Sequence, residues 1–283
     1  MLARRPGPEA QLNIRNEFQT VDYRKVGFWQ LVILALLMTV VTQAIHEGGH
    51  WVVYEGLGKG PVWSFTGLVQ TWETPPLHPD GWIETTAPDG TPGWWRLQSA
   101  PSKTENIIGL TAGPLASVLS VIFGLSLTLT RLKISPFTKQ AGLVLALITS
   151  LLMSQYYLRG FSRVGGDEYF IAAYLGIPKY IVDSPFTLAF ITGFILCLRA
   201  LGDRRTMLKW LGAIVLGSTP AGLFLMYANE VVQSQVDQGN PLFQPLLGFS
   251  LPVMIVNTTA LLALWIWWKR ASDQYYTSMK TSG

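Results

Sequence analysis

The chain has 283 residues, of which 49% are hydrophobic and only 13% are charged. Its apolar residues lie in long blocks, which is typical of a polytopic membrane protein and argues against a soluble domain. The net charge of +4 comes from basic residues at the ends of these blocks, so it does not indicate a nucleic-acid partner, and we expect none.

Six apolar blocks are each long enough to cross a membrane as a helix. They cover roughly residues 26–54, 107–129, 141–158, 185–201, 208–227 and 247–268. The expected fold class is therefore an all-α polytopic membrane protein with about six transmembrane helices. Lys and Arg residues gather on one side of these spans, so we expect a multi-pass protein of the cell membrane with both termini in the cytoplasm.

Residues 56–105, between the first two blocks, are rich in Trp, Pro, Gly and Thr and show little helical periodicity. Two Pro-Asp-Gly turns, at 79–81 and 88–90, flank residues 82–86, and the apolar run 94–97 follows. This pattern predicts a hairpin within a small β-rich extramembrane insertion. The four tryptophans of the insertion either anchor it at the lipid headgroups or form its small core; they are Trp72, Trp82, Trp94 and Trp95.

The first block contains His46-Glu47-Gly48-Gly49-His50, which uses two of the three histidines of the chain. Histidines four residues apart lie on one face of a helix, so both rings can reach one tetrahedral metal ion, with Glu47 beside a metal-bound water. Ionisable residues in an apolar helix require partners, and one zinc ion per chain would supply them. Gly48 and Gly49 allow another backbone to come close, either a neighbouring span or an extended substrate.

A catalytic zinc ion needs a third protein ligand and keeps its fourth position for water. Residues 165–169 read Gly-Gly-Asp-Glu-Tyr and follow the third block on the same side of the membrane as the two histidines. We expect Asp167 to be this ligand, with Glu168 as the alternative. The other interpretation is that Asp167 only caps the helix that follows it.

The second block begins with Ala112-Gly113-Pro114-Leu115-Ala116-Ser117. Together with the HExxH motif, this run resembles the site-two protease family of intramembrane zinc metalloproteases, whose second core span carries an Ala-Gly-Pro-x-x-Asn-like motif. The resemblance covers residues 26–175 and is that of a divergent member. Ser117 stands where the family usually has Asn, and Gly-Gly-Asp-Glu replaces the Asn-Pro-x-x-Pro-Leu-Asp-Gly run of the third span.

The resemblance implies a role for each matching residue. His46, His50 and Asp167 correspond to metal ligands, Glu47 to the general base, and Gly113, Pro114 and Ser117 to substrate-binding or structural positions. It also implies a division of the chain into a cytoplasmic tail (1–25), a metalloprotease core (26–175, with the insertion at 56–105), and accessory helices with a C-terminal tail (176–283). We expect the last dozen residues to fray.

The expected function is a zinc-dependent endopeptidase that cleaves a transmembrane or membrane-proximal segment of a membrane protein, using zinc-activated water and Glu47 as base. Its partners would be this substrate, the lipid bilayer and a regulatory protein. An unwound substrate needs new backbone hydrogen bonds, so we expect it to add as a strand to the sheet of the insertion, with Glu84 and Thr86 as test positions.

Two other functions fit parts of the pattern. One is a catalytically inactive metal-binding membrane scaffold of the same fold, although Glu47, which is not needed to bind a metal, points away from it. The other is a membrane zinc protease of the type that trims prenylated proteins, whose third ligand is a Glu. Gly113 and Pro114 argue against that second alternative.

Overall fold

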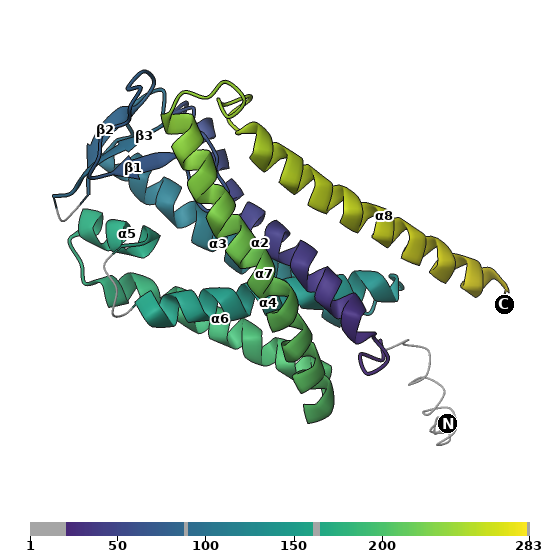
Figure 1. Ribbon diagram of the computed structural model, residues 1–283. Coiled ribbons are helices and arrows are strands. Elements are labelled where there is room, and N and C mark those ends of the chain that lie inside the picture. Colours follow the sequence, from purple (N-terminus) through teal and green to yellow (C-terminus); the bar gives the residue numbers. More distant parts are fainter. Residues whose placement is uncertain (1–20, 88–89, 161–164, 282–283) are drawn as a thin grey trace, which may run out of the picture.

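A computed structural model describes residues 21–87, 90–160 and 165–281 of the chain. In these residues it contains α2 (Phe28–Gly56), β1 (Gln70–Trp72), β2 (Ile83–Thr86), β3 (Pro92–Trp95), α3 (Lys103–Leu129), α4 (Pro136–Gly160), α5 (Asp167–Leu175), α6 (Lys179–Leu201), α7 (Arg204–Asp237) and α8 (Leu251–Thr281) (Figure 1). All of these helices except α5 are long and apolar enough to cross a membrane, which makes six candidate spans. The predicted mostly helical fold with six such spans and a small sheet is confirmed.

Several helices extend beyond the apolar blocks that predict them. Helix α6 begins at Lys179 and α7 ends at Asp237, so each helix includes polar residues beyond its apolar part. Helix α8 runs to Thr281 and so includes most of the dozen residues that we expected to fray. The helix persists there because its last turns contain neither Gly nor Pro. Residues 1–20 of the expected N-terminal tail lie outside the described residues.

Capping contacts define where helices α3, α7 and α5 begin or end. Ser102 and Glu105 form a capping box at the start of α3, in which each side chain accepts a hydrogen bond from the other residue's backbone N–H. The Asp203 carboxylate accepts hydrogen bonds from the first backbone N–H groups of α7. Gly176, with φ of 70°, ends α5 in the left-handed conformation.

The insertion folds into a three-stranded antiparallel sheet with the strand order β1-β3-β2. Strands β2 and β3 form the predicted hairpin, in which Glu84 lies opposite Trp94, while part of the second Pro-Asp-Gly turn, residues 88–89, lies outside the described residues. Strand β1 was not predicted, because three residues are too few to show an alternating pattern. Trp95 is buried in a small hydrophobic cluster with Tyr54 and Leu97, and Trp82 is buried in a larger cluster that includes residues of α2 and α7, while Trp72 and Trp94 are half-buried.

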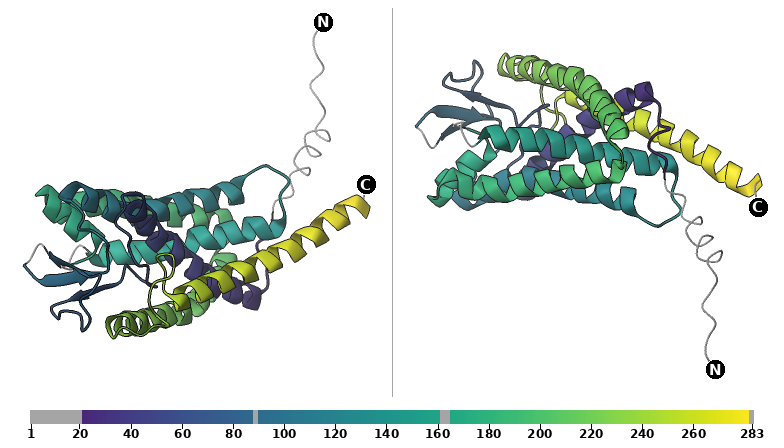
Figure 2. Two further views of the ribbon diagram at one scale, coloured as in Figure 1. Left: turned by 90° about the horizontal axis from the view of Figure 1, so that it is seen from above. Right: turned by 90° about the horizontal axis from the view of Figure 1, so that it is seen from below.

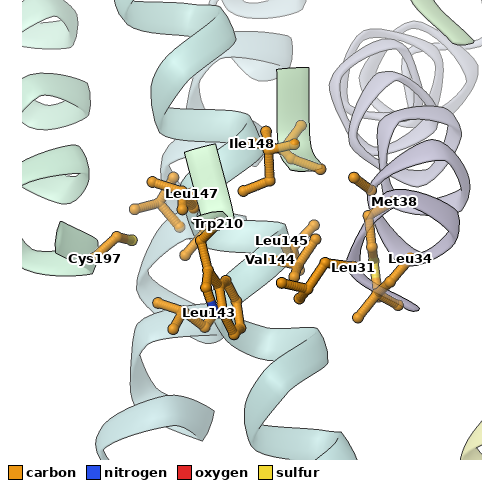
Figure 3. Packing of buried hydrophobic residues seen from close by; sticks show 14 of the residues in the cluster. Leu31, Leu34, Met38, Leu143, Val144, Leu145, Leu147, Ile148, Cys197 and Trp210 are labelled. Carbon is orange, nitrogen blue, oxygen red and sulfur yellow. The ribbon is translucent and has the colours of Figure 1, made fainter. Parts of the chain in front are cut away.

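Helix α4 lies at the centre of the bundle, and its side chains pack against those of α2, α6 and α7. Figure 3 shows Leu31 of α2, Leu143 of α4, Cys197 of α6 and Trp210 of α7 in this core, and all four are fully buried. Both views in Figure 2 place the sheet and α5 at the same end of the bundle. The core thus holds the long helices so that α2, α5 and the sheet meet at that end.

Candidate metal centre

The structure brings His46, His50 and Asp167 together from α2 and from the first residue of α5. Asp167 Oδ2 lies 3.5 Å from His46 Nε2 and 3.2 Å from His50 Nε2. The three potential ligand atoms all lie within 4.8 Å of one another, so this group could hold a metal ion. Of the two acids considered from the sequence, Asp167 and not Glu168 joins the histidines.

Helix α3 fixes the orientation of both imidazole rings. His50 Nδ1 lies 2.8 Å from the backbone carbonyl oxygen of Gly109, and since a carbonyl can only accept, Nδ1 carries the proton. His46 Nδ1 lies 3.0 Å from Ser117 Oγ. Both rings therefore turn their Nε2 atoms toward Asp167, and such contacts at the other ring nitrogen are what orient metal-binding histidines in proteins.

Small residues allow α2 and α3 to come this close. A side chain at Gly113 would collide with the ring of His50, and a Cβ at Gly49 would lie 2.6 Å from the carbonyl oxygen of Ala112. Gly49 therefore faces a neighbouring span, one of the two options that the sequence left open, whereas Gly48 faces the indole of Trp63. Pro114 is buried within α3, where its missing N–H leaves one helical carbonyl without its usual donor.

Two of the distances within this group are compatible with a bound metal ion such as zinc. Ligand atoms about 2.1 Å from a tetrahedral zinc ion are about 3.4 Å apart, and the two N–O distances at Asp167, 3.5 and 3.2 Å, lie close to this value. Two imidazole nitrogens with one carboxylate oxygen are also a donor set typical of catalytic zinc sites, which keep one position open.

Glu47 is 4% exposed and lines the same cavity as the two histidines. Gln43, one helical turn earlier, donates a hydrogen bond of 2.7 Å from Nε2 to Glu47 Oε1. This contact orients the carboxylate through one of its two oxygens. Gln43 was missed in the sequence, although its position four residues before Glu47 places it on the same helix face.

Asp167 and Glu168, the first two residues of α5, lie in different environments. Burial works to raise the pKa of the Asp167 carboxyl, but the charge of His50 and hydrogen bonds from both histidines outweigh it and lower that pKa below its usual range. Glu168 is 1% exposed, and burial raises the pKa of its carboxyl to about 7. Its Oε1 lies 3.5 Å from Lys179 Nζ, and its Oε2 accepts a hydrogen bond from the hydroxyl of Tyr156. Glu168 thus contacts Lys179 and Tyr156 and is not part of the candidate metal-binding group.

A cavity of about 720 Å³ lies against these residues. His46, Glu47, His50 and Asp167 line one part of it, and the sheet lines another part through Gln70 and Trp72 of β1 and Trp95 of β3. Tyr54, Leu110 and Phe170 add further apolar surface. The cavity therefore joins the candidate metal ligands to the edge strand β1.

The cavity lies along β1 and not along β2, the strand that contains the two test positions. Glu84 and Thr86 belong to β2, at the opposite edge of the sheet, and no residue of β2 lines the cavity. The sequence gives little signal for β1, because its place beside the metal ligands depends on contacts between distant parts of the chain.

Comparisons of this chain with known family models, with curated proteins and with solved structures give no match.

Proposed function

We propose that this chain is an intramembrane zinc endopeptidase, a divergent relative of the site-two proteases, that cleaves a transmembrane or membrane-proximal segment of a membrane protein. The observation that carries this proposal is the convergence of His46, His50 and Asp167 beside Glu47 on a cavity bounded by an edge strand. Six apolar helices support the membrane location, and the HExxH and Gly-Pro motifs support the class.

The residues of the site suit peptide hydrolysis. His46, His50 and Asp167 would hold the zinc ion, which supplies a water of lowered pKa and polarises a carbonyl group. Glu47 takes a proton at Oε2 and later gives it to the departing amine, while Gln43 keeps the carboxylate in place. Strand β1 lies across the cavity, where its backbone can bind a substrate in extended conformation.

The test compares purified parent protein with Glu47→Gln, which keeps the shape of the side chain and removes its basicity. We expect both proteins to retain about one zinc ion, because Glu47 is not among the three ligands. Cleavage of a membrane-spanning peptide should fall by at least about a hundredfold in the variant, the range expected for loss of a general base.

Metal content and peptide cleavage, measured on the same detergent-solubilised samples, check this expectation. Equal activity in the two proteins would point to a contaminating protease. A zinc-loaded parent that cleaves none of a panel of such peptides would favour the inactive metal-binding scaffold.

A further inference from the structure

The last turns of α7 present three polar side chains to the backbone of the segment that contains β1. Asn229, Gln233 and Asp237 are spaced four residues apart and share one face of the helix, and we call them the polar ladder. Asn229 Oδ1 accepts from the backbone N–H of Thr66 at 3.1 Å, and Asp237 Oδ1 accepts from that of Leu77 at 2.8 Å. The ladder thus spans the whole length of the strand.

The central member of the ladder makes a pair of hydrogen bonds like those of a neighbouring strand. Gln233 Oε1 accepts from the backbone N–H of Gln70 at 2.9 Å, and Gln233 Nε2 donates to the carbonyl oxygen of Leu68 at 3.2 Å. A residue of a parallel strand would use its own N–H and C=O on the same two groups. Its carboxamide therefore occupies a site shaped for a peptide backbone.

Strand β1 and the residues before it run along the cavity that holds the candidate metal ligands, although none of the three ladder residues lines it. Thr66, Leu68 and Gln70 line the cavity, and so does Met226 of α7. The other edge of β1 is already paired with β3. An extended peptide that reaches the metal ligands along this strand must take the hydrogen-bonding groups that the ladder now holds.

Helix α7 is interrupted near its middle by Pro220. Gly217, in the first half, packs against the backbone of α2 at Val32. Pro220 follows within the helix and removes one helical hydrogen bond, and Figure 2 shows that α7 is bent. Val232 and Val236 hold the second half by apolar contact, which tolerates sliding, whereas the ladder supplies the directional contacts.

We propose that the polar ladder is an internal cover that occupies the docking edge of β1, and that the second half of α7 moves aside when an extended peptide binds there. This proposal rests on the proposed function, because it takes the bound peptide to be the substrate. Binding itself can be measured without cleavage. The cover would exclude from this edge any peptide that cannot compete with the ladder for the backbone groups of β1.

The test uses full-length Glu47→Gln protein, so that no cleavage occurs, and a fluorescein-labelled leucine-rich membrane-span peptide with a Gly-Pro centre. Adding Gln233→Leu removes two hydrogen bonds from the cover, so peptide affinity, measured by fluorescence anisotropy, should rise roughly tenfold. Gln238→Leu is the matched control, because the Gln238 side chain is exposed and bonds only within α7. Its affinity should equal that of the Glu47→Gln parent.

A cross-link provides a second test that preserves the fold. Cys197 is the one cysteine of the chain and is buried, so cysteines placed at Thr66 and Asn229 can be joined selectively by a short bismaleimide. The joined protein should lose peptide binding, while the unjoined form, which lacks the Asn229 contact with Thr66, should bind at least as tightly as the Glu47→Gln parent.

Unchanged or weaker peptide binding by Gln233→Leu, or full binding by the cross-linked protein, would show that the ladder is a permanent structural tie and would overturn the proposal. Failure of the proposed function appears separately, as a zinc-loaded parent that binds the peptide and leaves it intact.

Discussion

At the scale of single residues, the site depends on which nitrogen of each histidine is occupied. The carbonyl of Gly109 and the hydroxyl of Ser117 take the two Nδ1 atoms, so the two Nε2 atoms are the ones that face Asp167. A hydrogen bond at one nitrogen makes the other a better ligand and limits rotation of the ring. The helices thus hold both rings in the orientation that a metal ion requires.

Asp167 and Glu168 are adjacent acids with different predicted roles. Asp167→Asn keeps the size of the side chain but removes an anionic ligand, so zinc affinity should fall by more than about a hundredfold, beyond the usual cost of changing an outer contact. Glu168→Gln should retain zinc, because Glu168 points to Lys179 and Tyr156. Metal content after dialysis against a weak chelator checks this, and a zinc loss confined to Glu168→Gln would contradict it.

Some of these contacts could be predicted from the sequence and some could not. The helical period alone places His46 and His50 on one face, and the side of the membrane leads to Asp167. The contact of His50 with Gly109 could not be predicted, because it depends on how closely two helices pack. The absence of a side chain at Gly113 permits that packing, but many glycines in the chain have no such role.

At the scale of elements, the position of α5 decides whether Asp167 reaches the histidines. Lys179, at the start of α6, donates hydrogen bonds from Nζ to the carbonyl oxygens of Gly160 at 3.0 Å and Gly165 at 3.2 Å. It also lies 3.5 Å from Glu168 Oε1. One ammonium group therefore ties the end of α4 and the residues before Asp167 to the start of α6.

Lys179→Met should release this tie. Glu168 would then lose its cationic partner and two carbonyl oxygens would lose a donor, so the protein should be destabilised by about 1–3 kcal/mol. Thermal unfolding in detergent should show a lower midpoint, and zinc affinity should fall as Asp167 loses its support. The double variant with Glu168→Gln should recover only part of the stability, because Asp183, which is fully buried, still lacks the charge of Lys179.

Lys103→Met serves as the control for loss of one positive charge, since Lys103 is exposed at the start of α3. An unchanged unfolding midpoint in Lys179→Met would show that the ion pair does not hold α5. A double variant as unstable as the single variant would assign the effect to the backbone contacts of Lys179.

The long helices and the hairpin follow from local patterns, which is why they could be predicted. Apolar blocks bounded by charges define the spans, and turn residues define the hairpin between β2 and β3. Helix α5 and strand β1 are both short. The position of α5 depends on Lys179, and that of β1 depends on the polar ladder of α7. Such contacts between distant residues leave no periodic signal.

At the scale of the whole molecule, one site joins three elements that are far apart in the sequence. Figure 1 shows α5 and the sheet at one end of the bundle and the start of α2 at the other. Helices α2 and α3 provide the imidazoles and their hydrogen-bond partners, and α5 provides the carboxylate. A bound ion would therefore cross-link the fold as well as support chemistry.

Removal of zinc should lower the stability of the entire protein. Free zinc at about a thousand times its dissociation constant stabilises a folded protein by about 4 kcal/mol. The unfolding midpoint of the parent should rise as zinc is added to chelator-treated protein and fall again with excess chelator. His50→Ala should show no dependence on zinc, and a midpoint of the parent that is insensitive to zinc would contradict the metal site.

The order of the site residues along the chain also bears on how the protein is made. During synthesis both imidazoles emerge with α2, whereas the carboxylate of Asp167 follows only after α3 and α4 have been translated. On the proposed function, a nascent or prematurely terminated chain that ends before Asp167 lacks the third ligand and cannot cleave other membrane proteins. Hydrolytic capacity would arise only once the ribosome has passed the middle of the message.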